Sequence, residues 1–98
     1  SSFSRIFCNS ISRFEKNSIF IWGDNKYTKK ITNYSNANNI DIIILDTSSS
    51  NIKYSLSYNS IIIIVSLSSS FIIKEKINDM FSDTLSKPKV FDFYDLIP

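Results

Sequence analysis

The sequence contains no histidine and only one cysteine, Cys8, so it lacks the side chains on which most catalytic and metal sites depend. Histidine is the usual general base near neutral pH, and a catalytic thiolate also needs a basic partner. A lone cysteine can form neither an intramolecular disulfide nor a cysteine-rich zinc site. We therefore expect no catalytic residue and no metal site in this chain, and we interpret Cys8 as a small apolar residue of a helix.

Long apolar runs and runs of one charge are also missing. The longest apolar run, from Ile61 to Val65, is far shorter than the roughly 20 residues of a membrane-spanning helix. Residues 1–17 lack the apolar segment of a signal peptide. The formal net charge is +2, and the densest basic run, KYTKK, is typical of a solvated helix face. The sequence thus predicts a cytoplasmic protein with no membrane and no nucleic-acid partner.

The chain does contain enough apolar material for one folded domain. It has 98 residues, of which 43% are hydrophobic and 14% aromatic, as is typical of a globular protein. Its first residue is Ser1 rather than methionine, so we expect a domain or a processed product of a longer protein.

Apolar residues follow two different spacings along the chain. Spacings of three and four residues predict helices over residues 3–16, from Tyr27 to Tyr34, and over residues 71–81. In the last of these helices, four side chains should face the core: Ile73, Ile77, Met80 and Phe81. Short runs that are apolar throughout predict strands that are parallel neighbours at residues 19–22, 40–45, 61–66 and 90–93, with Ile19–Ile21 and Ile61–Ile64 central and buried. A weaker alternation at residues 52–58 predicts a short edge strand.

Strands that alternate with helices and are apolar on both sides predict an α/β fold with a parallel sheet between two layers of helices. Right-handed crossovers leave few topologies, and the simplest is a small Rossmann-like three-layer domain with strand order 3-2-1-4-5. Residues 1–17 would form a leading helix that links to an upstream domain, and residues 18–98 would form the Rossmann-like domain. In this order, ligands bind where the first and fourth strands end.

The only glycine of the chain, Gly23, lies where the first strand meets the following helix. The sequence Gly23, Asp24, Asn25 has the composition of a turn, and either Asp24 or Asn25 is suited to cap the helix. Nucleotide-binding α/β proteins usually carry two or three glycines at this joint, which let the backbone approach the phosphates. The sequence therefore raises the question whether this turn still holds a phosphate.

Four segments in this order resemble a small Rossmann-like domain of bacterial polysaccharide-biosynthesis proteins: IFIWG, IDIIILD, SIIIIVSLSSSFIIKEKI and VFDFYDLI. Such domains occur at the N-terminus of PglD-type sugar acyltransferases and as appended domains of sugar methyltransferases and glycosyltransferases. The family pattern has a strand ending in Gly-x-Gly, a strand ending in Asp, and a strand ending in Ser or Ala. The resemblance covers residues 18–97 and implies a site for a nucleotide or a nucleotide sugar.

Carried over by position, Gly23 matches the first motif glycine, whereas Asn25 and Thr28 stand at the second and third. Asp46 matches the acidic residue that binds a ribose, which lies about 20 residues further on. Ser66 and the serines after it match the loop that follows the fourth strand. The resemblance thus implies a ligand site over Gly23, Asp24, Asn25, Asp46, Ser66, Ser68 and Ser69.

Physical chemistry argues against an intact phosphate cradle at this site. The Asn25 side chain obstructs the approach of the backbone, and Asp24 places a negative charge where a phosphate would sit. Asp46 is either a ribose ligand or a turn residue, and the serines of residues 66–70 either bind a sugar hydroxyl or cap the next helix. Asp92 and Asp95 are expected to be solvated turn carboxylates rather than a catalytic pair. We therefore expect NAD and nucleotide sugars to bind weakly.

Three functions follow from these residues and from the resemblance. The first is a non-catalytic or vestigial ligand-binding or docking domain of a glycan-biosynthesis protein, with a catalytic domain of the same parent protein as its partner. The second is the C-terminal portion of a sugar methyltransferase or glycosyltransferase that contributes to the sugar-nucleotide site. The third is a receiver-like adaptor, which would need an acidic pair after the first strand, and Asp24 with Asp46 does not supply that set.

Overall fold

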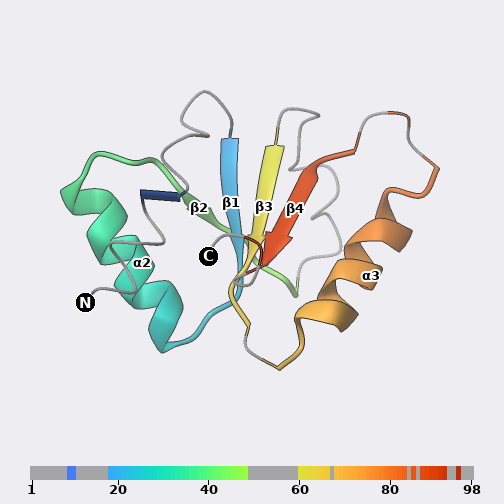
Figure 1. Ribbon diagram of the computed structural model, residues 1–98, viewed down its shortest axis with the longest axis horizontal. Helices are drawn as coiled ribbons and strands as arrows, with labels where there is room; N and C mark the ends of the chain where they lie inside the picture. Colours follow the sequence, from blue (N-terminus) through green and yellow to red (C-terminus); the bar gives the residue numbers. More distant parts are fainter. Residues whose placement is uncertain are drawn as a thin grey trace.

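The computed structural model describes residues 9–10, 18–48, 60–66, 68–83, 85, 87–92 and 95. Strands and helices alternate along this part of the chain (Figure 1). In order, they are β1 (Ser18–Trp22), α2 (Lys26–Ala37), β2 (Ile43–Ile44), β3 (Ser60–Ile64), α3 (Ser70–Met80) and β4 (Lys89–Asp92). The protein is therefore of the α/β class, as predicted.

The four described strands form one parallel sheet, and the prediction that these segments are parallel neighbours is confirmed. In the central pair, Ile19 of β1 lies opposite Ile61 of β3, and Trp22 lies opposite Ile64. β3 also pairs with β4, and β1 with β2. Because β1 and β3 each have a neighbouring strand on both sides, they are interior strands, which suits their almost entirely apolar sequences.

The described sheet has one strand fewer than the predicted sheet. The prediction placed five strands in the order 3-2-1-4-5, whereas the described sheet has four strands in the order β2-β1-β3-β4. The fifth strand was expected at residues 52–58, which lie outside the described residues. The outer position on that side of the described sheet is held by β2. The finer Rossmann-like assignment therefore stays a prediction.

β2 is also shorter than the predicted strand of residues 40–45, because the end of α2 extends into that segment. Asn38 is the C-cap of α2, and Asn39 follows it with a φ of 58°. The backbone N–H of Ile40 donates to the carbonyl of Ser35 at 2.9 Å, and that of Asn39 donates to Asn36 at 3.3 Å. These two bonds form a Schellman motif. Ile40 therefore closes the helix and does not begin the strand.

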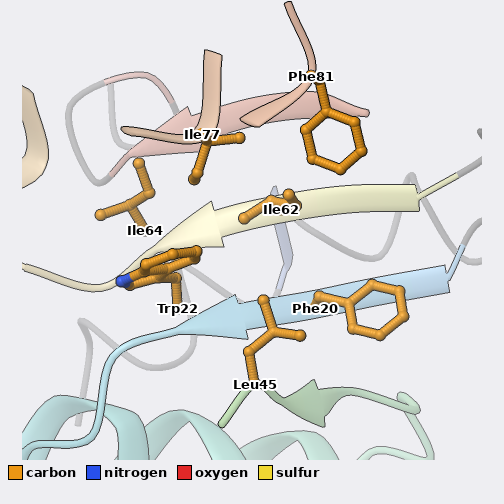
Figure 2. Close-up of a cluster of buried hydrophobic side chains, with 7 residues drawn as sticks. All are labelled: Phe20, Trp22, Leu45, Ile62, Ile64, Ile77 and Phe81. Atoms are coloured by element: carbon orange, nitrogen blue, oxygen red, sulfur yellow. The ribbon is translucent and has the colours of Figure 1, made fainter. Parts of the chain in front are cut away.

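Alternate side chains of β1 and β3 point to opposite faces of the sheet and build two cores. On one face, α2 contributes Ile31 to a cluster with Ile19, Ile21, Ile61, Ile63 and Val65. On the other face, α3 contributes Ile77, and Phe81 follows it; both pack against Phe20, Trp22, Leu45, Ile62 and Ile64 (Figure 2). The described part of the chain thus has three layers, with α2 and α3 on opposite faces of the sheet (Figure 1).

The predicted inward faces of the two helices are confirmed. Ile31 is fully buried, and Tyr27 and Tyr34 pack beside it against the α2 face of the sheet. In α3, Ile77 is buried, as is Phe81 just after the helix, and Ile73 and Met80 are packed against the same cluster.

The predicted leading helix lies largely outside the described residues, and the predicted edge strand at residues 52–58 lies wholly outside them. Of the predicted leading helix at residues 3–16, the structure describes Asn9 and Ser10, both helical. The division into a leading helix of residues 1–17 and a domain of residues 18–98 therefore stays a prediction. Within the described segments, we find no helix with the length and apolar character needed to cross a membrane.

Candidate functional site at the ends of β1 and β3

The carboxyl ends of β1 and β3 lie side by side, because the two strands are parallel and adjacent. From this edge the chain enters α2 after β1 and α3 after β3, and the two helices cover opposite faces (Figure 1). A pair of neighbouring strands whose connections leave in opposite directions defines a topological switch point, where open α/β sheets bind ligands. The predicted site residues that follow β1 and β3 therefore meet at one edge of the sheet.

Gly23 is required for close packing of the turn against the end of β3. Its φ is +146°, a backbone conformation that residues other than glycine rarely adopt. A Cβ atom at this position would lie 2.5 Å from the carbonyl oxygen of Val65. The backbone N–H of Val65 also donates to the carbonyl of Trp22 at 2.9 Å, which holds the two segments together. Close packing and backbone conformation thus explain why this position is a glycine, whether or not a phosphate binds there.

Asn25 is the N-cap of α2, which confirms one of the two residues predicted for that role. Its Oδ1 accepts from the backbone N–H groups of Tyr27 at 2.9 Å and Thr28 at 3.3 Å. In return, Thr28 Oγ1 accepts from the backbone N–H of Asn25 at 3.3 Å, which completes a capping box. Asp24, the other predicted cap, is exposed.

The remaining polar atom of the Asn25 side chain ties the turn to β3. Its Nδ2 donates to the carbonyl of Val65 at 2.9 Å. Thr28, at the position of the third motif glycine, donates its hydroxyl to the carbonyl of Gly23 at 3.1 Å. Two first-turn N–H groups, of the kind that bind phosphate in nucleotide-binding proteins, are therefore already bonded to the Asn25 side chain.

The serine loop after β3 faces this turn. Ser66 Oγ accepts from the backbone N–H of Ser69 at 3.1 Å. Ser69 is the N-cap of α3 by position, but its side chain makes no capping hydrogen bond. The Ser66 hydroxyl keeps its own O–H to donate elsewhere.

A pocket of about 500 Å³ lies between the turn and the serine loop, lined by Asn25, Lys26, Tyr27, Ser66 and Ser68. The Lys26 ammonium lies 5.2 Å from the centre of the Tyr27 ring. Asn25, Ser66 and Ser68 were predicted from the sequence as site residues, whereas Lys26 and Tyr27 were not. Their position in the first turn after the cap could have indicated that they line the site. The sequence pattern instead assigned Tyr27 only to the core and Lys26 only to the surface.

Asp46 is not among the residues that line this pocket. Its Oδ1 accepts from the backbone N–H of Ser48 at 3.1 Å and from the Ser48 hydroxyl at 2.6 Å. These bonds, the hydroxyl bond first, hold the pKa of the exposed Asp46 carboxyl below its ordinary value. Of the two alternatives left open for Asp46, these contacts favour the turn residue.

A second polar cluster at the end of β4 was not predicted. Asp92 is buried, so the expectation of a solvated carboxylate is wrong for this residue. Lys74 of α3 contacts Asp92 Oδ2 at 3.1 Å and Asp95 Oδ2 at 3.0 Å. Each carboxylate also accepts from the other residue's backbone N–H at 2.9 Å. The lysine pairs with both acids, and burial of Asp92 is tolerated because its charge is compensated.

These contacts shift the pKa values of two members of this cluster. The hydrogen bond from the Asp92 backbone and the nearby Lys74 ammonium lower the pKa of Asp95. The hydrogen bond to Asp95 raises the pKa of Lys74. Within the described segments, no three histidine, cysteine or acidic side chains lie together as metal ligands.

The chain matches no protein-family model, no curated protein and no solved structure. The geometry alone defines an α/β protein with a parallel sheet and a self-capped helix at the switch point.

Proposed function

We propose that the chain is a non-catalytic ligand-binding or docking domain of a glycan-biosynthesis protein in which nucleotide-phosphate binding is weak or lost. The observation that carries this proposal is the side chain of Asn25, which fills the N-terminus of α2. The resemblance to Rossmann-like sugar-nucleotide domains supplies the parent class and a catalytic domain of the same protein as partner.

A phosphate at this turn would have to displace Asn25 from three contacts. The ligand would replace the oxygen that accepts from Tyr27 and Thr28, and the Val65 carbonyl would lose its donor. An N-cap side chain contributes about 1 kcal/mol, and a lost partner of a half-buried carbonyl adds about 1 kcal/mol. The adjacent Asp24 carboxylate opposes an anion further. The loss of the cap, the loss of the Val65 partner and the Asp24 charge all reduce the net free energy with which a phosphate could bind.

The described charged residues outside the pocket also favour a non-catalytic reading. Asp92 and Asp95, the best placed pair of carboxylates, are both engaged by Lys74. A carboxylate that is hydrogen-bonded to a backbone N–H and paired with a lysine is a poor general base, because its pKa is held low.

Calorimetric and NMR titration of the full chain with UDP-glucose and with NAD tests the proposal. We expect dissociation constants of about 1 mM or weaker, equivalent to roughly 4 kcal/mol of binding free energy. Asn25→Gly should tighten binding, because it frees the N–H groups of the first turn and lets the backbone approach the phosphates.

Asn39→Gly is the matched control, since it makes the same substitution at the other end of α2. It should leave binding unchanged. Micromolar binding of UDP-glucose or NAD by the unaltered chain would contradict the proposal, whereas unchanged weak binding in Asn25→Gly would show that the cap is not what blocks the phosphate.

A further inference from the structure

We propose that the pocket between the start of α2 and the serine loop binds a monosaccharide that carries a carboxylate. This inference deepens the proposed function and rests on it, because it names the ligand of the same edge of the sheet once nucleotide phosphate is excluded. The pocket volume of about 500 Å³ lies within the roughly 300–1,000 Å³ of small-molecule sites.

The hydroxyl groups of a sugar fit the polar side chains on the serine side of the pocket. Ser66 accepts from the Ser69 backbone, so its hydroxyl hydrogen is left to donate. Ser68 is exposed at the pocket, and its hydroxyl can both donate and accept. Sugars offer matched donors and acceptors at short spacing, which suits two serines on one loop.

The α2 side of the pocket supplies a cation and an aromatic ring. Lys26 forms no ion pair with any other described residue, and its ammonium lies over the Tyr27 ring, 5.2 Å from the ring centre. An anionic group on the ligand would give this ammonium a partner. The half-buried Tyr27 ring offers an apolar wall for the C–H groups of a pyranose.

The anionic group is a carboxylate rather than a phosphate. A phosphate needs several donors around three oxygens, and the N–H groups of Tyr27 and Thr28 are already bonded to Asn25. A singly charged carboxylate is satisfied by one ammonium and one hydroxyl. Asp24, exposed next to the turn, also opposes a dianion more strongly than a monoanion.

The test is an amide chemical-shift titration of the full chain with glucuronate, glucose and glucose 1-phosphate. We expect glucuronate to shift the amides of Lys26, Tyr27, Ser66 and Ser68, and to bind more tightly than either other sugar. Lys26→Gln should weaken glucuronate binding about fivefold and leave glucose unchanged. Lys29→Gln, an exposed lysine of α2 that does not line the pocket, should change neither.

Equal binding of glucose and glucuronate, or no effect of Lys26→Gln, would overturn the inference. Tighter binding of glucose 1-phosphate would assign the pocket to a phosphate instead, and an absence of shifts at Ser66 and Ser68 would remove the site. These outcomes leave the proposed function standing as long as UDP-glucose and NAD bind weakly. Micromolar UDP-glucose binding would instead defeat the proposed function itself.

Discussion

Two strands of the sheet, β1 and β4, end in junctions that tie the strand end to a neighbouring element. One junction is held by neutral hydrogen bonds and the other by ion pairs. The β1–α2 turn is tied to the neighbouring strand β3 by neutral groups, the Asn25 amide and the Val65 carbonyl. The end of β4 is tied to α3 by charges, with Lys74 between Asp92 and Asp95. Neutral bonds do not titrate and are little affected by salt, whereas the charged junction depends on both. The turn that resembles a phosphate site is therefore a structural junction held by neutral hydrogen bonds.

The largest effect is expected from Gly23→Ala, which tests how closely the neutral junction is packed. The new methyl group would meet the Val65 carbonyl at 2.5 Å and would sit on a backbone at φ +146°. We expect a loss of about 3 kcal/mol or more in the free energy of unfolding. Urea unfolding followed by the fluorescence of Trp22, the only tryptophan, measures it.

Asn36→Ala serves as a control for Gly23→Ala, because Asn36 is exposed on α2. Its effect should stay within about 0.5 kcal/mol. A loss below about 1 kcal/mol for Gly23→Ala would mean that the turn can move away from β3, and that the junction is looser than described.

Asn25→Ala should have the second largest effect, since it removes both the cap of α2 and the donor to Val65. We expect a loss of about 2 kcal/mol, about half from each. Asn25→Asp keeps the acceptor for the N–H groups and loses the donor, so it should fall between the native chain and the alanine variant. If both variants lost the same amount, the cap would contribute nothing, and the bond to Val65 would carry the whole effect.

The charged junction should make the free energy of unfolding depend on pH. The folded-state pKa of Asp95 lies below its ordinary value of 3.8, so its contribution is complete above that value and is lost as the pH falls through the folded-state pKa. Lys74 behaves in the opposite direction: its pKa is raised above 10.5, so its contribution is complete below that value and is lost as the pH rises through the folded-state pKa.

Asp95→Asn should therefore lower stability at about pH 6 and flatten the acid limb of the stability profile below the ordinary Asp pKa of 3.8. The loss should be smaller than for Asn25→Ala, because Asp95 is partly exposed and such pairs contribute less than about 1 kcal/mol. Unfolding at each pH measures it, with Asp79→Asn on the exposed side of α3 as the control. An unchanged acid limb in Asp95→Asn would mean that other carboxylates govern the acid response.

Asn39→Gly should give the smallest effect and the opposite sign. Asn39 occupies the left-handed position of the Schellman motif at the end of α2, with φ 58°. Glycine adopts this conformation without the penalty of a Cβ, so we expect a gain of about 0.5 kcal/mol. Thermal unfolding checks it. A loss of stability would indicate that the Asn39 side chain makes a contact that glycine cannot replace.

The sequence was sufficient to predict the parts of the fold that depend on local pattern. Runs of isoleucine placed β1 and β3 inside the sheet, and turn composition narrowed the cap of α2 to Asp24 or Asn25. It failed where a residue's partner is distant. Asp92 was expected to be solvated because Lys74, its partner, lies on a helix that precedes β4. The length of β2 was overestimated because Ile40 is apolar, although its N–H is used by α2.

The candidate site was predicted only in part, for a related reason. Its position followed from topology, and Asn25, Ser66 and Ser68 followed from the order of strands and loops. Lys26 and Tyr27 were missed because helical periodicity assigns each residue either to the core or to solvent. Residues that line a pocket at the surface belong fully to neither group. The bond from Asn25 to Val65 joins residues 40 positions apart, which no local pattern reveals.

That separation also bears on how the chain folds during its synthesis. The first half of the domain contains α2 and its cap, but Asn25 cannot reach its acceptor until Val65, 40 positions later, has been made. At about 5–20 residues per second, the ribosome needs roughly 2 to 8 seconds to add that length. A helix forms within about a microsecond. The segment that forms α2 is therefore synthesised seconds before its junction with Val65 can form, and β3 is the later strand that completes this junction.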